Sequence, residues 1–97
     1  MYRQGDLLFI KTDAIGENAT MLRDTKVILG SSVTGHAHKL SDGFVYSNEP
    51  KWGDNANFYL NVPNGANVLH EEHGPIPLPA GIYKVIRQRE VNGYVVD

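Results

Sequence analysis

Apolar and polar residues alternate along several short stretches of this chain, as they do in strands that bury one face. In residues 57–62, NFYLNV, the apolar Phe58, Leu60 and Val62 alternate with Asn and Tyr. Other short stretches are rich in β-branched and aromatic residues and are bounded by Gly, Pro, Asn or Asp, which also predicts strands. The predicted strands are residues 6–12, 26–31, 44–47, 57–62, 67–71, 81–90 and 94–97.

Two Asn-Gly pairs, Asn64-Gly65 and Asn92-Gly93, stand between strand-like stretches. Asn-Gly is favoured in type I′ turns, where both central residues need positive φ, so we expect an antiparallel hairpin at each pair. No segment has a convincing helical period. Residues 13–25 come nearest, and we predict a long loop there with at most one helical turn.

The pattern predicts an all-β fold, a small antiparallel barrel or sandwich with no long helix, as a single domain over residues 1–97. A chain of this length buries a modest fraction of its surface, so we expect a homodimer. No apolar run approaches the roughly 20 residues that span a bilayer, and no secretory signal is visible. We therefore expect a cytoplasmic protein with no membrane partner. The absence of cysteine excludes disulfides and thiolate zinc sites.

The formal net charge of -2 argues against a long nucleic-acid duplex as partner, because binding a duplex depends on a stripe of basic residues. Positive charge is concentrated only in KVIRQRE, residues 84–90, which holds Lys84, Arg87 and Arg89. Arg87 and Arg89 are two apart and would share one strand face. This patch would suit a small phosphorylated ligand or a few nucleotides.

All four histidines lie in two short stretches, TGHAHKL at residues 34–40 and HEEHGP at residues 70–75. Three explanations compete. The histidines could be ligands of a metal ion, carriers of protons in a reaction without a metal, or ordinary surface residues in two turns. Their grouping into two compact pairs, each beside a glycine, weakens the third explanation.

The spacing places each histidine relative to the expected strands. His36 and His38 are two apart, so both would point to one face of a strand. His70 would lie in a strand on the same face as Val68, where it could pack in the core, and His73 would lie at the following turn.

A metal site has partial support from the sequence. GSSVTGHAH, residues 30–38, fits the first part of the cupin pattern, and LPAGIY, residues 78–83, resembles the Pro-x-Gly turn of its second part. Imidazoles with a carboxylate are common ligands of zinc, iron or manganese. However, the Glu expected after His-x-His is missing, and Asp42 is the nearest carboxylate. Lys84 stands near the place of the second-part histidine, and an ammonium group cannot bind a metal.

The same histidines fit metal-free cleavage of an RNA-type phosphodiester, in which the substrate's own 2′-OH is the nucleophile. Such cleavage needs a base, an acid and cations, and histidine's ordinary pKa of ~6.5 suits both proton transfers. We expect His36 or His38 to carry one proton and His73 the other, with His70 the weakest candidate. No cofactor is required. Substrate contacts are assigned to Thr34, Lys39, Lys84, Arg87 and Arg89, and Glu72 is assigned to orienting an imidazole.

YRQGDLLFI, VTGHAHKL and HEEHGPIPLPAGIYKVIRQRE resemble a group of small proteins of phages, plasmids and bacterial genomes. The resemblance covers nearly the whole chain, and the TGHAH and HEEHGPI blocks are specific. Through this group the chain resembles CRISPR-associated ring nucleases, small dimeric proteins that destroy the cyclic oligoadenylate messengers of type III CRISPR systems.

The resemblance implies metal-independent cleavage of 3′-5′ linkages in a small cyclic oligonucleotide, with the chain's own histidines in the site. Two alternatives stay open from the residues alone. One is a cupin-like metal-binding protein that uses the histidines as ligands. The other is a module that sequesters a nucleotide without cleaving it.

Overall fold

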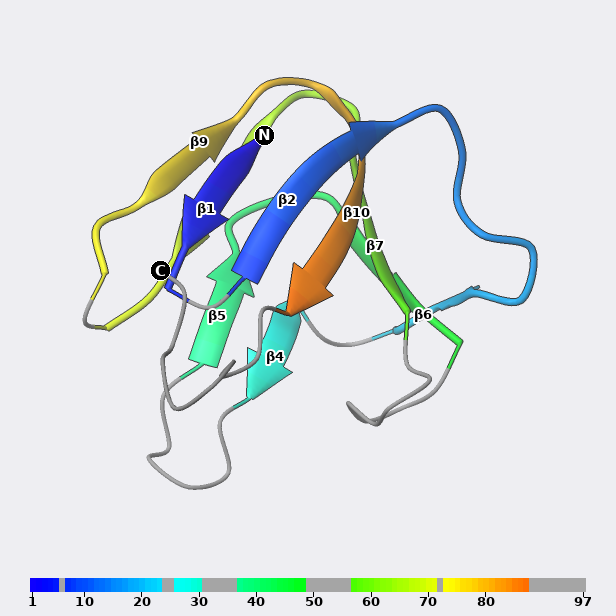
Figure 1. Cartoon of the computed structure of the whole chain (residues 1–97), viewed down its shortest axis with the longest axis horizontal. Helices are drawn as coiled ribbons and strands as arrows, with labels where there is room; N and C mark the ends of the chain where they lie inside the picture. The colour runs from blue at the N-terminus through cyan, green and yellow to red at the C-terminus, as the bar shows by residue number, and fades with distance from the viewer. Residues whose placement is uncertain (6, 24–25, 31–36, 49–56, 72, 88–97) are drawn as a thin grey trace, which may run out of the picture.

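Two antiparallel sheets pack face to face in the computed structural model of the chain, which describes residues 1–5, 7–23, 26–30, 37–48, 57–71 and 73–87 (Figure 1). The first sheet has the order β1 (Tyr2–Gln4), β2 (Leu7–Thr12), β10 (Gly81–Arg87), β7 (Phe58–Val62), β6 (Phe44–Ser47) and β3 (Thr20–Met21). The second has the order β4 (Val27–Gly30), β5 (Ala37–Leu40), β8 (Ala66–Leu69) and β9 (Ile76–Leu78). The described residues contain no helix, so the predicted all-β fold is confirmed, in the form of a sandwich.

The core lies between the two sheets and follows the alternation seen in the sequence. Phe58, Leu60 and Val62 of β7 are buried, whereas Tyr59 and Asn61 between them are only half-buried. The same alternation occurs in β10, where Tyr83 and Val85 are buried. Both sheets contribute to one cluster, made of Leu7, Phe9, Ile28, Leu40, Val45, Phe58, Leu60, Val62, Val68, Leu78, Tyr83 and Val85.

Tyr83 is the largest fully buried side chain among the described residues, and its polar end is satisfied. Its hydroxyl donates to the Pro79 carbonyl at 2.7 Å, and its ring meets the ring of Tyr2 edge-on with centroids 6.1 Å apart. Burial, with a smaller effect from Tyr2, raises the pKa of Tyr83 above the ordinary 10.0, so the phenol remains a donor.

The hairpin predicted at Asn64-Gly65 is wrong. β7 and β8 do not pair with each other, because they lie in different sheets. The Gly65 N–H donates to the Val62 carbonyl at 3.0 Å, which makes Pro63 and Asn64 the central residues of the turn. Proline fixes φ for the first central position of an ordinary turn, so Pro63 moves the turn one residue towards the N-terminus.

The other predictions of strands, loops and turns can be compared with the observed elements. Those at 6–12, 26–31, 44–47, 57–62, 67–71 and 81–90 each overlap an observed strand, whereas β1, β3, β5 and β9 were not predicted. Residues 13–23 form the expected loop, with a turn in which the Ala19 N–H donates to the Gly16 carbonyl, followed by the two residues of β3. The strand at 94–97 and the hairpin at Asn92-Gly93 lie outside the described residues.

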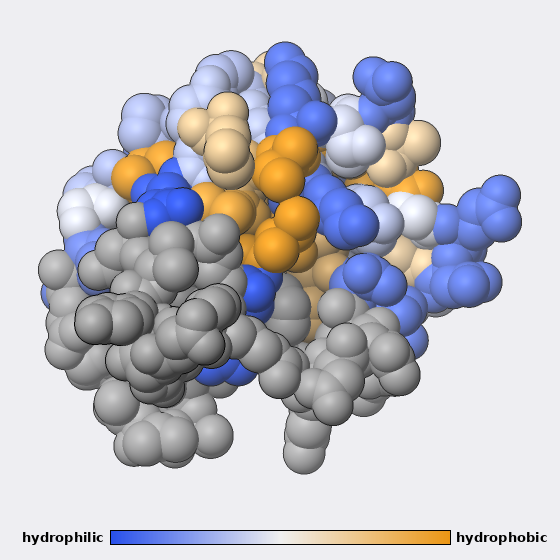
Figure 2. All heavy atoms as spheres, viewed as in Figure 1, coloured by the Kyte–Doolittle hydropathy of each residue, from blue (hydrophilic) through white to orange (hydrophobic). Residues whose placement is uncertain are grey.

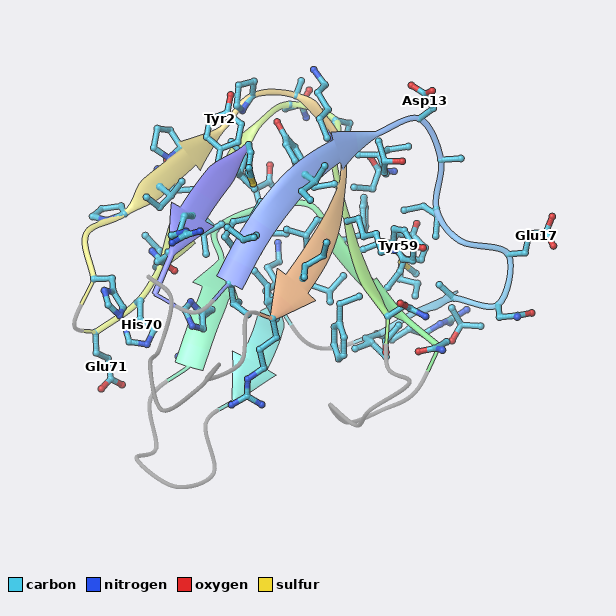
Figure 3. The ribbon with its side chains drawn as sticks, in the orientation of Figure 1. Tyr2, Asp13, Glu17, Tyr59, His70 and Glu71 are labelled. Carbon is cyan, nitrogen blue, oxygen red and sulfur yellow. The ribbon has the colours of Figure 1, made fainter. Side chains whose placement is uncertain are left out.

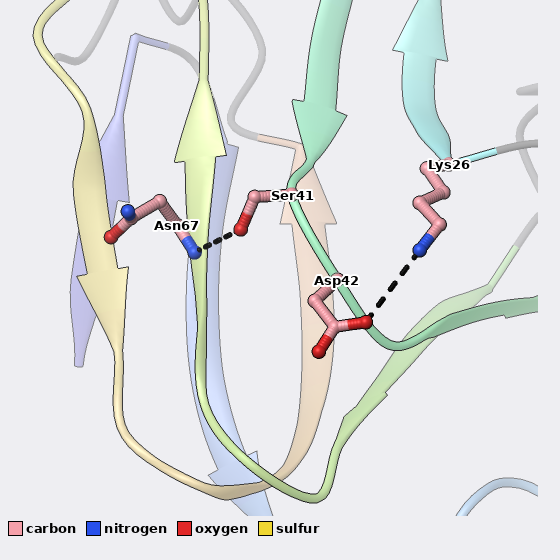
Figure 4. A network of polar contacts seen from close by, with 4 residues as sticks. All are labelled: Lys26, Ser41, Asp42 and Asn67. Atoms are coloured by element: carbon pink, nitrogen blue, oxygen red, sulfur yellow. Dashed lines mark hydrogen bonds and ion pairs between the residues drawn. The ribbon is translucent and has the colours of Figure 1, made fainter.

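The segment after β5 carries the chain from the second sheet to β6 in the first, and hydrogen bonds to β8 hold its start (Figure 4). The Ser41 N–H donates to the Asn67 carbonyl at 2.9 Å, and the Asn67 N–H donates to Ser41 Oγ at 2.8 Å. An exposed ion pair joins Lys26 and Asp42 at 3.7 Å, and such exposed pairs contribute little. These contacts fix one end of β5 and β8, the end away from His38.

The outward face of the first sheet carries some hydrophobic side chains. Ile10 of β2 is 37% exposed and Phe44 of β6 is 46% exposed, and Figure 2 shows apolar atoms gathered around β2 on the visible face. No helix in the described part of the chain is long and apolar enough to cross a membrane.

Candidate functional site

The pairing of β5 with β8 brings two histidines together. Leu40 pairs with Val68 in this ladder, and both are buried in the core. Continuing the register by two residues places His38 opposite His70, on the same face as this core pair. The two rings accordingly lie with centroids 4.4 Å apart and planes tilted by 42°. His38 is buried, with 5% of its surface exposed, and His70, just after β8, is half-buried.

The turn after β8 adds a third imidazole. The His73 ring lies with its centroid 4.7 Å from that of His70, and the His73 backbone N–H donates to His70 Nδ1 at 3.4 Å. In Figure 3 the side chain of Glu71, between them in sequence, points away from the His70 ring. Two chain segments that are far apart in sequence thus form a cluster of His38, His70 and His73, which we call the histidine cluster.

The backbone of Gly5 lies directly against the histidine cluster. β1 and β2 pair with Gln4 opposite Leu7, so Gly5 lies in the tight connection between the two strands, where it has φ +59°. A Cβ atom on Gly5 would lie 2.8 Å from His73 Nε2 and 3.6 Å from His38 Cε1. Glycine is therefore needed here both for the turn conformation and for the approach of His73.

The side chain of Gln4 connects the histidine cluster to both sheets. Gln4 is 2% exposed, and its Nε2 donates to the Val68 carbonyl at 2.8 Å and to the Gly74 carbonyl at 2.9 Å. Its Oε1 lies 2.8 Å from His38 Nδ1. One amide of β1 thus contacts β8, the turn that carries His73, and the His38 ring.

An open pocket adjoins the histidine cluster. Its volume is about 380 Å³, and it is lined by Arg3, Gln4, Gly5, His73, Gly74, Pro75 and Ile76. Arg3 is half-buried and forms no ion pair with the acidic residues that the structure describes. A guanidinium and an imidazole on one small concave surface suit a ligand with a phosphate group.

A larger open hollow of about 730 Å³ lies against Tyr2 and β9. The described residues that line it include no histidine, arginine or lysine. The smaller pocket beside the histidine cluster is therefore the better candidate for a functional site, because it holds the groups that can move protons and bind anions.

The other residues assigned from sequence are placed less closely together. Lys39 is exposed and follows the buried His38, so it lies on the opposite face of β5. Lys84 lies on the outward face of β10, since the buried residues on either side of it face the core. Arg87 is exposed at the end of β10, where it pairs with Leu7 at the start of β2. Four assigned residues lie outside the described ranges: Thr34, His36, Glu72 and Arg89.

The described residues contain no group of three or more His, Asp or Glu side chains arranged to hold a metal ion. Asp42, the nearest carboxylate after His-x-His, pairs with Lys26 instead. It is four residues from His38, about 13 Å along an extended chain. In the histidine cluster the Nδ1 lone pair of His70 faces the His73 N–H.

Arg3, Gln4 and Gly5 were not identified as site residues from the sequence. Gly5 followed by Asp6 before an apolar run is a recognised two-residue hairpin signal, which would have predicted β1. That hairpin would have placed Arg3 and Gln4 on an edge strand. No sequence signal indicates that Gln4 meets His38, because the two belong to different sheets.

Comparison with known sequence families places this site within a shared domain. Residues 3–88 match the family described as Domain of unknown function (DUF8820), and the chain belongs to that family. The matched range includes Arg3, Gln4, Gly5 and the histidine cluster. Comparisons with curated proteins and with solved structures gave no match.

The contact between Gly5 and the histidine cluster can be tested with two alanine substitutions. Gly5→Ala should destabilise the fold by about 2 kcal/mol, because the left-handed backbone and the contact with His73 both oppose a Cβ atom. It should also shift the side-chain NMR signals of His73 and His38. Gly74→Ala is the matched control, since a Cβ there meets nothing within 4 Å. Equal effects of the two substitutions on stability and on these signals would contradict the contact.

Proposed function

We propose that this member of the DUF8820 family is a metal-independent phosphodiesterase that cleaves a small RNA-type nucleotide by attack of the substrate's own 2′-OH. The observation that carries the proposal is the histidine cluster beside a pocket lined by Arg3. It provides more than one imidazole for proton transfer and a cation for phosphate within one small region.

The proposed reaction has one displacement at phosphorus. A neutral imidazole removes the 2′-OH proton, the 2′ oxygen forms a bond to phosphorus, and the bond from phosphorus to the 5′ oxygen breaks. An imidazolium donates its proton to the leaving 5′ oxygen. The products are a 2′,3′-cyclic phosphate and a 5′-hydroxyl, so no water and no cofactor is consumed in this step.

We assign the two proton transfers to His38 and His73. They come from different segments, and their rings approach the same point above Gly5 from His38 Cε1 and His73 Nε2. Acid and base act on different oxygens of the phosphodiester, so two rings that come from separate segments and approach one point suit the task. His70 lies next to both rings in the histidine cluster, where it can hold their positions. His36 stays an alternative partner of His73.

Of the cations that the structure describes, Arg3 is the one best placed to bind the phosphate. It lines the same pocket as His73, and a guanidinium presents paired donors that match phosphate oxygens. In the transition state the same group would stabilise the added negative charge on the phosphorane. Lys84, by contrast, does not line this pocket.

The arrangement of His70 supports the metal-free mechanism. A neutral imidazole binds a metal through the nitrogen that carries its lone pair. In His70 the Nδ1 lone pair is directed to the His73 N–H, so the Nε2 of the neutral ring carries the proton. In this geometry His70 does not offer a lone pair to an ion shared with its neighbours.

The substrate class rests on the family resemblance. The TGHAH and HEEHGPI blocks resemble CRISPR-associated ring nucleases, so we propose cyclic oligoadenylate as the substrate and the cytoplasm as the place of action. Cyclic oligoadenylate consists of RNA-type linkages that each carry a 2′-OH. It is small enough to need no basic stripe, in agreement with the net charge of -2.

The reaction is tested with purified protein and cyclic oligoadenylates of several ring sizes in excess EDTA. We expect cleavage under these conditions and products that carry a 2′,3′-cyclic phosphate by mass spectrometry. A substrate with 2′-deoxyribose at the scissile position should resist cleavage, because it lacks the nucleophile. Loss of activity on chelation together with a co-purified metal would favour a cupin-like site, and tight binding without turnover would favour a sequestering module. Either outcome contradicts the proposal.

The roles of the residues are tested by separate variants of the same protein. His73→Ala should lower kcat by about 10²–10⁴-fold while substrate affinity is largely retained. Arg3→Ala should mainly weaken substrate binding, with a smaller loss in kcat. Lys84→Ala is its matched control, since it removes one positive charge from the same face of the first sheet, at a residue that does not line the pocket. Equal losses of affinity in Arg3→Ala and Lys84→Ala would show that charge alone, and not the pocket, binds the substrate.

We also propose that the protein acts as a homodimer. The chain is short, and Phe44 is 46% exposed on the outward face of the first sheet, so association would cover apolar surface. Light scattering on the eluting protein should give twice the mass of one 10.8 kDa chain. A single-chain mass maintained at high protein concentration would rule the dimer out.

A further inference from the structure

Gln4 is the buried polar residue that contacts the histidine cluster most directly, and its amide has only one possible orientation. Both groups that face its Nε2, the carbonyls of Val68 and Gly74, can only accept hydrogen bonds. The NH₂ group must therefore face them. The Oε1 atom is then the one that faces His38 Nδ1, at 2.8 Å.

The amide orientation determines where the neutral His38 ring holds its proton. An amide oxygen can only accept, so His38 Nδ1 must donate and must carry hydrogen. In a neutral imidazole only one nitrogen carries hydrogen, and the lone pair is then on Nε2. The same hydrogen bond persists when His38 takes up a proton, because Nδ1 still donates in the imidazolium.

The neighbouring His70 holds the opposite tautomer. Its Nδ1 accepts from the His73 backbone N–H, so the proton of its neutral ring is on Nε2. The two neutral rings, whose centroids are 4.4 Å apart, thus carry their protons on different nitrogens. The Gln4 oxygen selects Nδ1–H in His38, and the His73 backbone N–H selects Nε2–H in His70. Free histidine would exchange between both tautomers, so the surrounding contacts select one for each ring.

We infer that Gln4 is a positioning residue that fixes His38 as the Nδ1–H tautomer, so that His38 Nε2 is the base for the 2′-OH proton. This inference rests on the proposed phosphodiesterase and extends it by assigning the base. His73, which lines the pocket, is then the acid that protonates the 5′ oxygen. Gln4 does for His38 what a buried acidic residue does for the histidine of a hydrolase triad, but without a charge.

The same side chain also sets the position of the acid. Gln4 Nε2 holds the carbonyl of Gly74, the residue next to His73. A second donated bond holds the carbonyl of Val68, at the end of the strand that precedes His70. Gln4 therefore has two separable roles: its NH₂ group fixes the backbone of the turn, and its oxygen selects the His38 tautomer.

The tautomer is measured directly by ¹⁵N NMR of the imidazole nitrogens in the wild-type protein, at a pH where His38 is neutral. We expect the Nδ1–H pattern for His38 and the Nε2–H pattern for His70. This measurement needs neither a variant nor a substrate, so it is independent of folding defects and of turnover. A His38 ring that is mainly Nε2–H would overturn the inference, even if the protein cleaves cyclic oligoadenylate.

Two substitutions separate the roles of the Gln4 amide. Gln4→Leu removes both the donors and the acceptor, and we expect it to lower kcat by about 10–100-fold with little change in KM. Gln4→Glu keeps an oxygen that accepts from His38 Nδ1 but loses the NH₂ group. It should retain the Nδ1–H pattern and more of the kcat than Gln4→Leu retains. Folding of each variant is checked by urea denaturation.

The outcomes distinguish this inference from the proposed function. Equal loss of kcat in both variants, with the His38 tautomer unchanged in Gln4→Leu, would mean that Gln4 is only structural and would overturn the inference. A wild-type protein that cleaves no RNA-type substrate overturns the phosphodiesterase and the role of His38 as its base. An Nδ1–H pattern that is present in the wild type and lost in Gln4→Leu would still establish that Gln4 selects the tautomer. Cleavage together with the expected NMR patterns and variant order supports both.

Discussion

The buried amide of Gln4 is the contact on which the arrangement of the site depends. β1 and β9 lie side by side at one edge of the sandwich (Figure 1), yet no strand pairing joins them among the described residues. Gln4 of β1 links the two sheets here through hydrogen bonds to the Val68 and Gly74 carbonyls and through its contact with His38. A buried amide left without these partners would be strongly unfavourable, so the sheets, the turn and the ring are fixed together.

The fold could be predicted to a large extent because local pattern and tertiary structure agree in it. Burial alternates in β7 as the sequence alternates, so the strand and its buried face were both evident. The prediction at Asn64-Gly65 failed because a turn signal says where the chain reverses and not which sheet it enters next. Pro63 also changed the turn type, and the chain passes there from one sheet to the other.

The site was predictable only in part. The sequence predicted that His70 shares the strand face of Val68. This position places His70 opposite His38 when the β5–β8 register is continued. However, the strand containing His38 was not predicted, and the meeting of the rings depends on its register. The contribution of Arg3, Gln4 and Gly5 could not be derived, since it arises from contacts between sheets. Glutamine has no typical functional role that would single it out in a sequence.

The bridge made by Gln4 also relates the site to the order in which the chain folds. Its partners are 34, 64 and 70 residues away in sequence, at His38, Val68 and Gly74. Contacts of such long range form late, because a large loop must be closed before they are made. Neither sheet alone contains the complete set of groups. A partly folded chain therefore has no assembled site. The groups come together only after both sheets have formed and packed against each other.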